Sequence, residues 1–484
     1  MPEGADGPRK TLLFGHPQGL GVIAATEFWD RISFHGMQSL LVLFMAEQLF
    51  RPGRIETIIG FEAFRSAIFT VTGPLSTQAL ASQIFGLYAG MVYLTPVAGG
   101  LVGDRLTGRR AAVTAGALMM AAGHACMVFD QTFLIALLLL ILGAGLFRGN
   151  LAAQVGALYD GKDRRRAFGF QIYYAMLNAG ALIAPLITGT LASRAGWHYG
   201  FGFAGLGMLV GVVVYLAGNR TVPPDPPRKP KGERTQLTAR ERRVVQGVLG
   251  LLPVAMLFWV AQTQIWNTYN LWARDHLDLN VSGFQIPVPW MQSVDSFFTA
   301  ALLPVVLWIW KAQARRGKEP DELGKMALGC FAFAAAVLVL AAAGMHDGGR
   351  SRSALGWAIA FHAISNIGYL YFAPTAVALV SRVAPPALNA MLIGLYLTSI
   401  FFGSLFAGRI GALYELLPPV QFWLVHAIAA ALAGVLLLGL AGTFRRSFGT
   451  PASVAIEMEP QSPQFTADCS AGTRRGSRQS GKAG

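Results

Sequence analysis

Three ionisable residues stand close together in an apolar stretch near the start of the chain. Glu27, Asp30 and Arg31 occur in EFWDRISFHG, inside the longer run LGVIAATEFWDRISFHGMQSLLVLFM. A helix places them on one face, because Asp30 and Arg31 follow Glu27 by three and four positions. Each charge costs roughly 2.5–3.5 kcal/mol at the centre of a membrane helix. We therefore predict an inward-facing cluster in which the excess acid takes up a proton, although a static ion-pair cluster that fixes helix packing would have the same spacing.

The composition around this cluster indicates an all-α, polytopic membrane protein. The 484 residues are 54% hydrophobic and 13% charged, whereas soluble globular proteins carry about 25% charged residues. Apolar stretches long enough to cross a bilayer as helices recur along the chain. We expect about twelve such spans, at residues 19–46, 79–102, 110–129, 132–158, 167–192, 199–218, 244–272, 287–311, 323–345, 353–381, 387–413 and 418–443.

The charges outside these spans predict the topology. Most of the 39 Lys and Arg residues fall in alternate connections, on the side that also holds both ends of the chain. By the positive-inside rule, we expect both termini in the cytoplasm. We also expect the protein to be integral to the plasma membrane, the inner membrane of a bacterium. The net charge of +14 is thereby explained without a nucleic-acid partner. The 3 cysteines suggest neither a disulfide framework nor a metal site, and residues 1–18 show no signal peptide.

A Pro-rich and charged segment, RTVPPDPPRKPKGERTQLTARERR, divides the spans into two groups of six. We expect a cytoplasmic N-terminal segment (1–18), a six-helix bundle (19–218), a cytoplasmic linker (219–243), a second bundle (244–444) and a disordered tail (445–484). Two six-helix halves are typical of transporters whose binding site lies between the halves.

The connection between the second and third spans, GGLVGDRLTGRR, resembles the loop signature of the major facilitator superfamily. The positive-inside rule explains its arginines but not its spacing of Gly and Asp. The resemblance implies a charge network of Asp104, Arg105, Arg109 and Arg110 that holds one conformation of the transporter. It also implies the major facilitator fold, with twelve transmembrane helices in two six-helix bundles.

Longer matches point to one family within this superfamily. EFWDRISFHGM, GAGLFRGN, FGFQIYYAMLNAGALIAP, FWVAQTQIWNTYNLWA and GFQIPVPWMQSVDSFF resemble motifs of the proton-dependent oligopeptide transporters, across about residues 15–443. The resemblance implies a membrane transporter, not an enzyme, that imports di- or tripeptides or peptide-like carboxylates together with protons. Peptide, protons and membrane lipid are then its partners, and the proton gradient drives it without a cofactor or metal.

The resemblance also implies roles for individual residues. Glu27, Asp30, Arg31 and Arg148 take the positions that couple proton movement to transport in the family. Arg31 and Arg148 would in addition bind the substrate carboxylate by charge-assisted bonds. The other implied pocket residues, for which packing is the alternative, are His35, Tyr88, Tyr93, Tyr173, Tyr174, Asn178, Asp295 and Tyr369.

Several positions depart from the family pattern, among them Gln38 at a usually basic position and His35 at the position of a tyrosine. Thr263 and Tyr369 stand where the family has acids, and Asp295 stands where it usually has Asn. Asp295 either replaces the missing acids as a partner for amines or protons, or it pairs locally near a water-filled end. These departures leave an amine-free organic anion, or a sensor that does not transport, as alternatives. We assign His124, His362 and His426 to packing, and no motif of an intramembrane enzyme is present.

Overall fold

The computed structural model describes residues 15–160, 163, 165–225, 237–347, 352–385 and 388–448, and these residues are almost entirely helical. The predicted N-terminal segment and tail lie largely outside the described residues, and so does the middle of the predicted linker, 226–236. The elements are α1 (Gln18–Phe44), α2 (Phe61–Thr72), α3 (Thr77–Val102), α4 (Arg109–Cys126), α5 (Phe133–Ala157), α6 (Arg165–Arg194), α7 (Trp197–Gly218), α8 (Ala239–Thr263), α9 (Thr268–His276), β1 (Asn280–Val281), β2 (Phe284–Gln285), α10 (Trp290–Arg315), α11 (Glu322–Asp347), α12 (Leu355–Val383), α13 (Asn389–Gly411), α14 (Pro419–Gly439) and α15 (Ala441–Phe448).

The long helices are those of an integral membrane protein. Within the described residues, 10 helices are long and apolar enough to cross a bilayer. Two further long helices, α1 and α4, lie among them. They are less apolar than the other ten. Any 18 consecutive residues of α1 include the charged residues Glu27, Asp30 and Arg31, and α4 has only 18 residues and begins with two arginines. All twelve predicted spans are therefore helical, and α1 bears its charges in the bundle interior, because Glu27 and Asp30 are buried.

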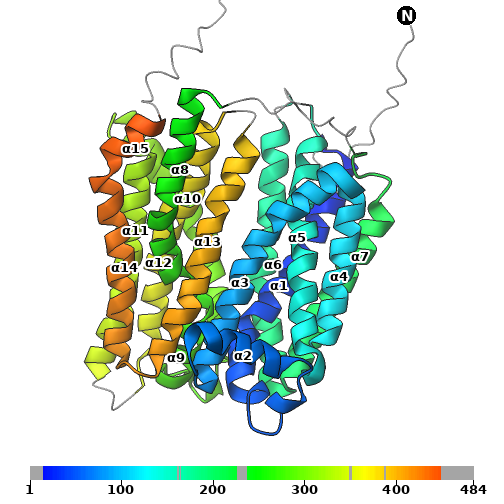
Figure 1. Ribbon diagram of the computed structural model, residues 1–484, viewed down its shortest axis with the longest axis vertical. Helices are drawn as coiled ribbons and strands as arrows, with labels where there is room; N and C mark the ends of the chain where they lie inside the picture. Colours follow the sequence, from blue (N-terminus) through cyan, green and yellow to red (C-terminus); the bar gives the residue numbers. More distant parts are fainter. Residues whose placement is uncertain are drawn as a thin grey trace, which may run out of the picture.

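The helices form two bundles that stand side by side (Figure 1). Helices α1 and α3–α7 make one bundle, and α8 and α10–α14 make the other. Between the bundles, α3 of the first packs against α13 of the second. Further contacts between the halves join α6 to α10 and α1 to α9. Residues that face this interface can therefore be supplied by both halves of the chain.

Several local features were not predicted. The short helix α2 lies before α3. A small antiparallel hairpin, in which β1 and β2 have two residues each, precedes α10. The seventh span is broken, since α8 ends at Thr263 and α9 begins at Thr268 after a 3₁₀ turn. Helix α8 begins at Ala239, inside the expected linker, where a capping box between Thr238 and Glu241 closes its N-terminus. Helix α15 runs to Phe448, so the first residues of the expected tail are helical.

The two bundles are joined most closely at the end of the molecule opposite α15. Asn267 donates a hydrogen bond of 2.7 Å to the Ser82 hydroxyl, and Arg274 donates one of 3.0 Å to Gln78. The indole N–H of Trp290 in α10 bonds to the Leu186 carbonyl of α6 at 3.0 Å. Each of these bonds joins one half to the other, so the structure has this end closed.

Glycine permits the close approach of α3 and α13. A Cβ atom on Gly86 would lie 2.4 Å from the Ser404 carbonyl oxygen, and one on Gly411 would lie 1.9 Å from the Ser82 hydroxyl oxygen. Both distances are shorter than any real contact of a Cβ atom, so a larger residue would force the helices apart. The closed end thus depends on small residues that come from both halves.

Candidate functional site

The charges of α1 form a buried cluster with residues of α6. Arg31 donates from Nε to Glu27 Oε1 at 2.7 Å, and its guanidinium lies 3.4 Å from Asp30 Oδ2. The Tyr173 hydroxyl of α6 donates to Glu27 Oε2 at 2.7 Å. Helix α6 comes this close because Gly180 faces α1, where a Cβ atom would lie 2.7 Å from the Arg31 Cβ atom. The predicted common face of Glu27, Asp30 and Arg31 is therefore confirmed, with Tyr173 as a further partner.

Arg148 of α5 completes the cluster from the opposite side. Its Nε lies 3.8 Å from Asp30 Oδ2, and its guanidinium carbon lies 3.8 Å from the centre of the Phe34 ring. Within the described residues, Arg148 Nε and one terminal nitrogen are buried without a hydrogen-bond acceptor, and both Asp30 oxygens lack a donor. A cation on an aromatic face is stabilised by about 2 kcal/mol when it is removed from water. Phe34 thus holds a guanidinium whose hydrogen-bonding capacity is largely unused.

The cluster is neutral as a unit, with two carboxylates and two guanidinium groups. The carboxylates are sealed in, since Glu27 and Asp30 are 0% and 1% exposed, whereas the arginines retain 11% and 12% exposure. An anion that reaches the site would therefore meet the arginines before the acids. Arg148, which has unused N–H groups, can hold one carboxylate together with Arg31, partly in a bidentate manner.

The aromatic residues extend from this cluster toward the second bundle. Tyr88 of α3 is buried within electrostatic range of Arg148, and Tyr93 lies within range of both Arg148 and Tyr369. Tyr369 of α12 lies in turn within range of Asp295. The structure therefore brings the two halves of the predicted site to one region, with tyrosines between the arginines and Asp295.

The remaining predicted pocket residues are placed less tightly. His35 packs its ring 5.1 Å from that of Trp266, across the boundary between the halves. Tyr174 is 58% exposed, and the Asn178 side chain donates to the Tyr174 carbonyl, one turn earlier in α6. Thr263 bonds to Ser404 at 3.2 Å. His35 also lies within electrostatic range of Arg31 and Arg148, and the ring of Tyr174 packs against that of Tyr173.

Asp295 belongs to a second buried polar network, in the second bundle. Its Oδ1 is 3.1 Å from His362 Nδ1 and accepts a hydrogen bond of 2.8 Å from Asn366. The other ring nitrogen of His362 lies 2.9 Å from the Tyr269 hydroxyl of α9. The assignment of His362 to packing alone is therefore wrong. His124 and His426 bond to Ser33 and Gln264, respectively, as packed histidines commonly do.

The loop between α3 and α4 pairs its charges differently from the expectation. Asp104 accepts a hydrogen bond of 2.9 Å from Arg109 Nε, while Arg105 is exposed. The Asp225 carboxylate, from the connection after α7, accepts from the backbone N–H groups of Arg109 and Arg110 at 2.7 and 3.1 Å. Arg110 also donates to the carbonyls of Val222 and Pro223. Asp225 thus caps α4, a role that no local sequence signal indicated.

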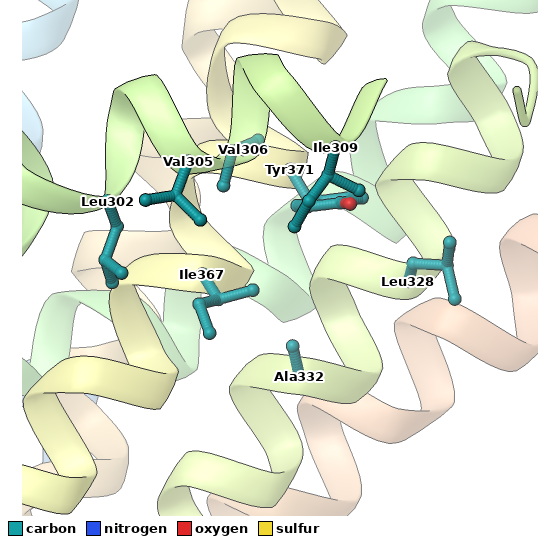
Figure 2. Close-up of a pocket in the computed structure, with 8 residues that line it drawn as sticks. All are labelled: Leu302, Val305, Val306, Ile309, Leu328, Ala332, Ile367 and Tyr371. Carbon is teal, nitrogen blue, oxygen red and sulfur yellow. The ribbon is translucent and has the colours of Figure 1, made fainter. Parts of the chain in front are cut away.

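A cavity between α10, α11 and α12 is not this site. It has a volume of about 260 Å³, and Figure 2 shows the side chains that line it. Seven of the eight labelled side chains are aliphatic, and the hydroxyl of Tyr371 is the single polar group among them. It therefore offers no charge to a peptide or an organic anion.

Two bundles of long apolar helices, with a buried charge cluster in the first bundle and tyrosines between it and the second, define the class of the protein as a membrane transporter. A family model described as "POT family" matches residues 110–237 and 231–424. The peptide transporter YePEPT of Yersinia enterocolitica is 30% identical, over 84% of this chain and 89% of the relative. The di-/tripeptide transporter of Lactococcus lactis subsp. cremoris is 25% identical, over 88% of this chain and 95% of the relative.

Solved structures give the same result. A peptide transporter POT variant in complex with alafosfalin superposes with a TM-score of 0.78 and 26% identity, covering 91% of this chain and 97% of that chain. The same transporter in complex with sulfate also gives a TM-score of 0.78. The chain belongs to the POT family, and these relatives and structures are transporters and not enzymes. The predicted family and the major facilitator fold are therefore confirmed.

Proposed function

We propose that the chain is a proton-coupled symporter that imports di- or tripeptides, or peptide-like carboxylates, across the bacterial inner membrane. All four relatives and structures above are named as peptide transporters, and one of these structures holds alafosfalin. Both termini then lie in the cytoplasm, as the distribution of Lys and Arg predicts. The observation that carries the proposal is the neutral cluster of Glu27, Asp30, Arg31 and Arg148.

Charge balance gives this cluster a reason to bind a proton and a carboxylate together. A substrate carboxylate held by Arg31 and Arg148 changes the net charge from zero to −1. One proton on Glu27 or Asp30 restores neutrality, and it releases an arginine from its internal partner. Because an uncompensated charge in the membrane interior costs roughly 2.5–3.5 kcal/mol, the two ligands favour each other's binding by a comparable free energy.

Movement of the bound ligands requires the closed end to open. The hydrogen bonds of Asn267, Arg274 and Trp290 between the halves would break in that transition. The same site would then face the other side of the membrane, which is alternating access of two bundles around a fixed site. Protons that move down their gradient supply about 2.3 kcal/mol per 100 mV from the electrical part alone.

The test is uptake of labelled dialanine into liposomes that contain the purified protein, under an imposed pH gradient. Wild type should concentrate the peptide, while Glu27→Gln should exchange it across the membrane without concentrating it. The control is Glu62→Gln, which should leave uptake unchanged, because in the described part of the chain Glu62 pairs only with Arg65 of its own helix, α2. Gradient-driven accumulation by Glu27→Gln would refute the role of Glu27.

An amine-free organic anion is the second candidate substrate. The two arginines are retained in the first half, whereas Thr263 and Tyr369 replace acids in the second. In the same liposomes, uptake of N-acetyl-dialanine in preference to dialanine would support this candidate. A failure of both compounds to enter would instead support a sensor that does not transport.

A further inference from the structure

Asp295 is the only Asp, Glu, Lys or Arg in the central stretches of the second-bundle helices. Residues 244–273, 326–345, 355–381, 389–408 and 419–439 contain no Asp, Glu, Lys or Arg, and Asp295 is the only such residue in 290–310. Its side chain is 12% exposed, and within the described residues it pairs with no lysine or arginine. A carboxylate in this position needs a positive charge or a proton from another source.

His362 can supply that proton. Its ring is 0% exposed and lies between Asp295 Oδ1 and the Tyr269 hydroxyl. A protonated ring donates from both nitrogens, whereas a neutral ring donates from Nδ1 to Asp295 and accepts at Nε2. The Tyr269 hydroxyl can be acceptor in the first case and donor in the second, so the network holds either state without moving a heavy atom.

The second oxygen of Asp295 remains free for a ligand. Both hydrogen bonds to its carboxylate, from His362 and Asn366, are made to Oδ1. None of the described residues donates a hydrogen bond to Oδ2. Tyr369, one of the tyrosines between Asp295 and the arginines, lies within electrostatic range of this carboxylate. An ammonium group that reaches Oδ2 would place two positive charges on one carboxylate if His362 were still protonated.

We propose that Asp295, His362 and Tyr269 form a second proton-holding site, at which the ammonium group of a substrate competes with a proton on His362 for the charge of Asp295. When the ammonium binds Oδ2, His362 gives up its extra proton to water and remains neutral, bonded to Tyr269. A substrate without an amine leaves the proton in place. The inference rests on the proposed function, and it distinguishes between substrate classes that the first-half cluster binds alike.

The titratable groups around His362 are few. Helix α10 contributes Asp295 and helix α9 contributes Tyr269, while Tyr369 lies on α12 itself. The stretches of α8, α11 and α13 given above add no charged side chain. The pH dependence that follows can therefore be assigned to the Asp295–His362 pair.

The experiment measures the binding of dialanine and of N-acetyl-dialanine to the purified full-length protein by calorimetry between pH 5.5 and 7.0, where the peptide amine remains protonated. Measured in buffers of different ionisation enthalpy, dialanine should release about one more proton than its acetylated form. Its affinity relative to the acetylated form should rise by up to about tenfold per pH unit. If wild type released the same number of protons on binding dialanine as on binding N-acetyl-dialanine, the inference would be overturned without any variant.

Variants locate the effect. His362→Gln should make the affinity ratio of the two peptides independent of pH, and Asp295→Asn should remove the preference for the amine as well. His426→Gln is the matched control, a buried histidine of the same bundle that bonds to Gln264 instead of an acid, and it should behave as wild type. A pH-dependent ratio that persists in His362→Gln would overturn the inference.

The same measurements separate this inference from the proposed function. Gradient-driven uptake of dialanine with a ratio that does not depend on pH would leave the symporter proposal intact and refute only the second site. Binding of neither peptide would refute the peptide substrate and the second site together.

Discussion

The closed end of the molecule offers a direct test of alternating access through Gly86→Ala. Helices α3 and α13 lie side by side between the bundles (Figure 1). A Cβ atom on Gly86 would lie 2.4 Å from the Ser404 carbonyl oxygen and 2.8 Å from the Gly408 backbone. Because ordinary contacts begin at 3.4 Å, the helices must separate by roughly 1 Å, and backbone atoms cannot rotate away as a side chain can.

The magnitude follows from that overlap. Overpacking of this kind typically costs about 1–3 kcal/mol. It destabilises only the state in which α3 and α13 are in contact at this end. The equilibrium between the two states should therefore move away from the closed end by roughly 5- to 150-fold. Transport should slow, because each cycle must pass through the state that has become unfavourable.

The assay is a distance measurement across the closed end, with spin labels on cysteines that replace the exposed residues Ser66 and Leu416 and with the native cysteines removed. Gly86→Ala should shift the distribution to longer distances and reduce peptide uptake. Gly100→Ala is the control, since no atom lies within 4 Å of its Cβ position on the same helix. Unchanged distances together with normal uptake in Gly86→Ala would refute the argument that close packing here maintains the closed state.

Three further predictions concern other contacts of the described residues. Asp225→Ala should remove the cap of α4, destabilise the protein by about 0.5–2 kcal/mol and lower its thermal unfolding midpoint. Asp104→Ala, which breaks an exposed ion pair, should lower the midpoint less. Equal midpoints for the two variants would contradict this prediction. Arg148→Lys should keep transport but weaken carboxylate binding by roughly tenfold, because an ammonium cannot bind in a bidentate manner; an unchanged dissociation constant in calorimetry would argue against a bidentate contact. Trp290→Phe should remove the hydrogen bond from the indole N–H to α6, which contributes about 0.5–1.5 kcal/mol. A cysteine at the closed end should then react faster with a thiol reagent. Reaction at the wild-type rate would show that this bond does not hold α10 to α6.

The predicted spans and the face of the α1 cluster depend on local properties. A long apolar stretch can satisfy its backbone in a membrane only as a helix, so each span was readable from its own residues. The common face of Glu27, Asp30 and Arg31 follows from helical periodicity alone. The break between α8 and α9 and the short helix α2 were missed, because the first interrupts an apolar run and the second is too short to cross a membrane.

The partners of these charges depend on the packing of helices that are remote in sequence. Tyr173 meets Glu27 across 146 positions, and His362 meets Asp295 across 67. The sequence around a single buried histidine does not show whether its ring packs against apolar side chains or bonds to a carboxylate. The sequence by itself determined that charges had to lie inside the bundle, because hydrocarbon does not tolerate them. Only the tertiary structure decided which groups neutralise them, because that depends on which helices pack together and how each is rotated.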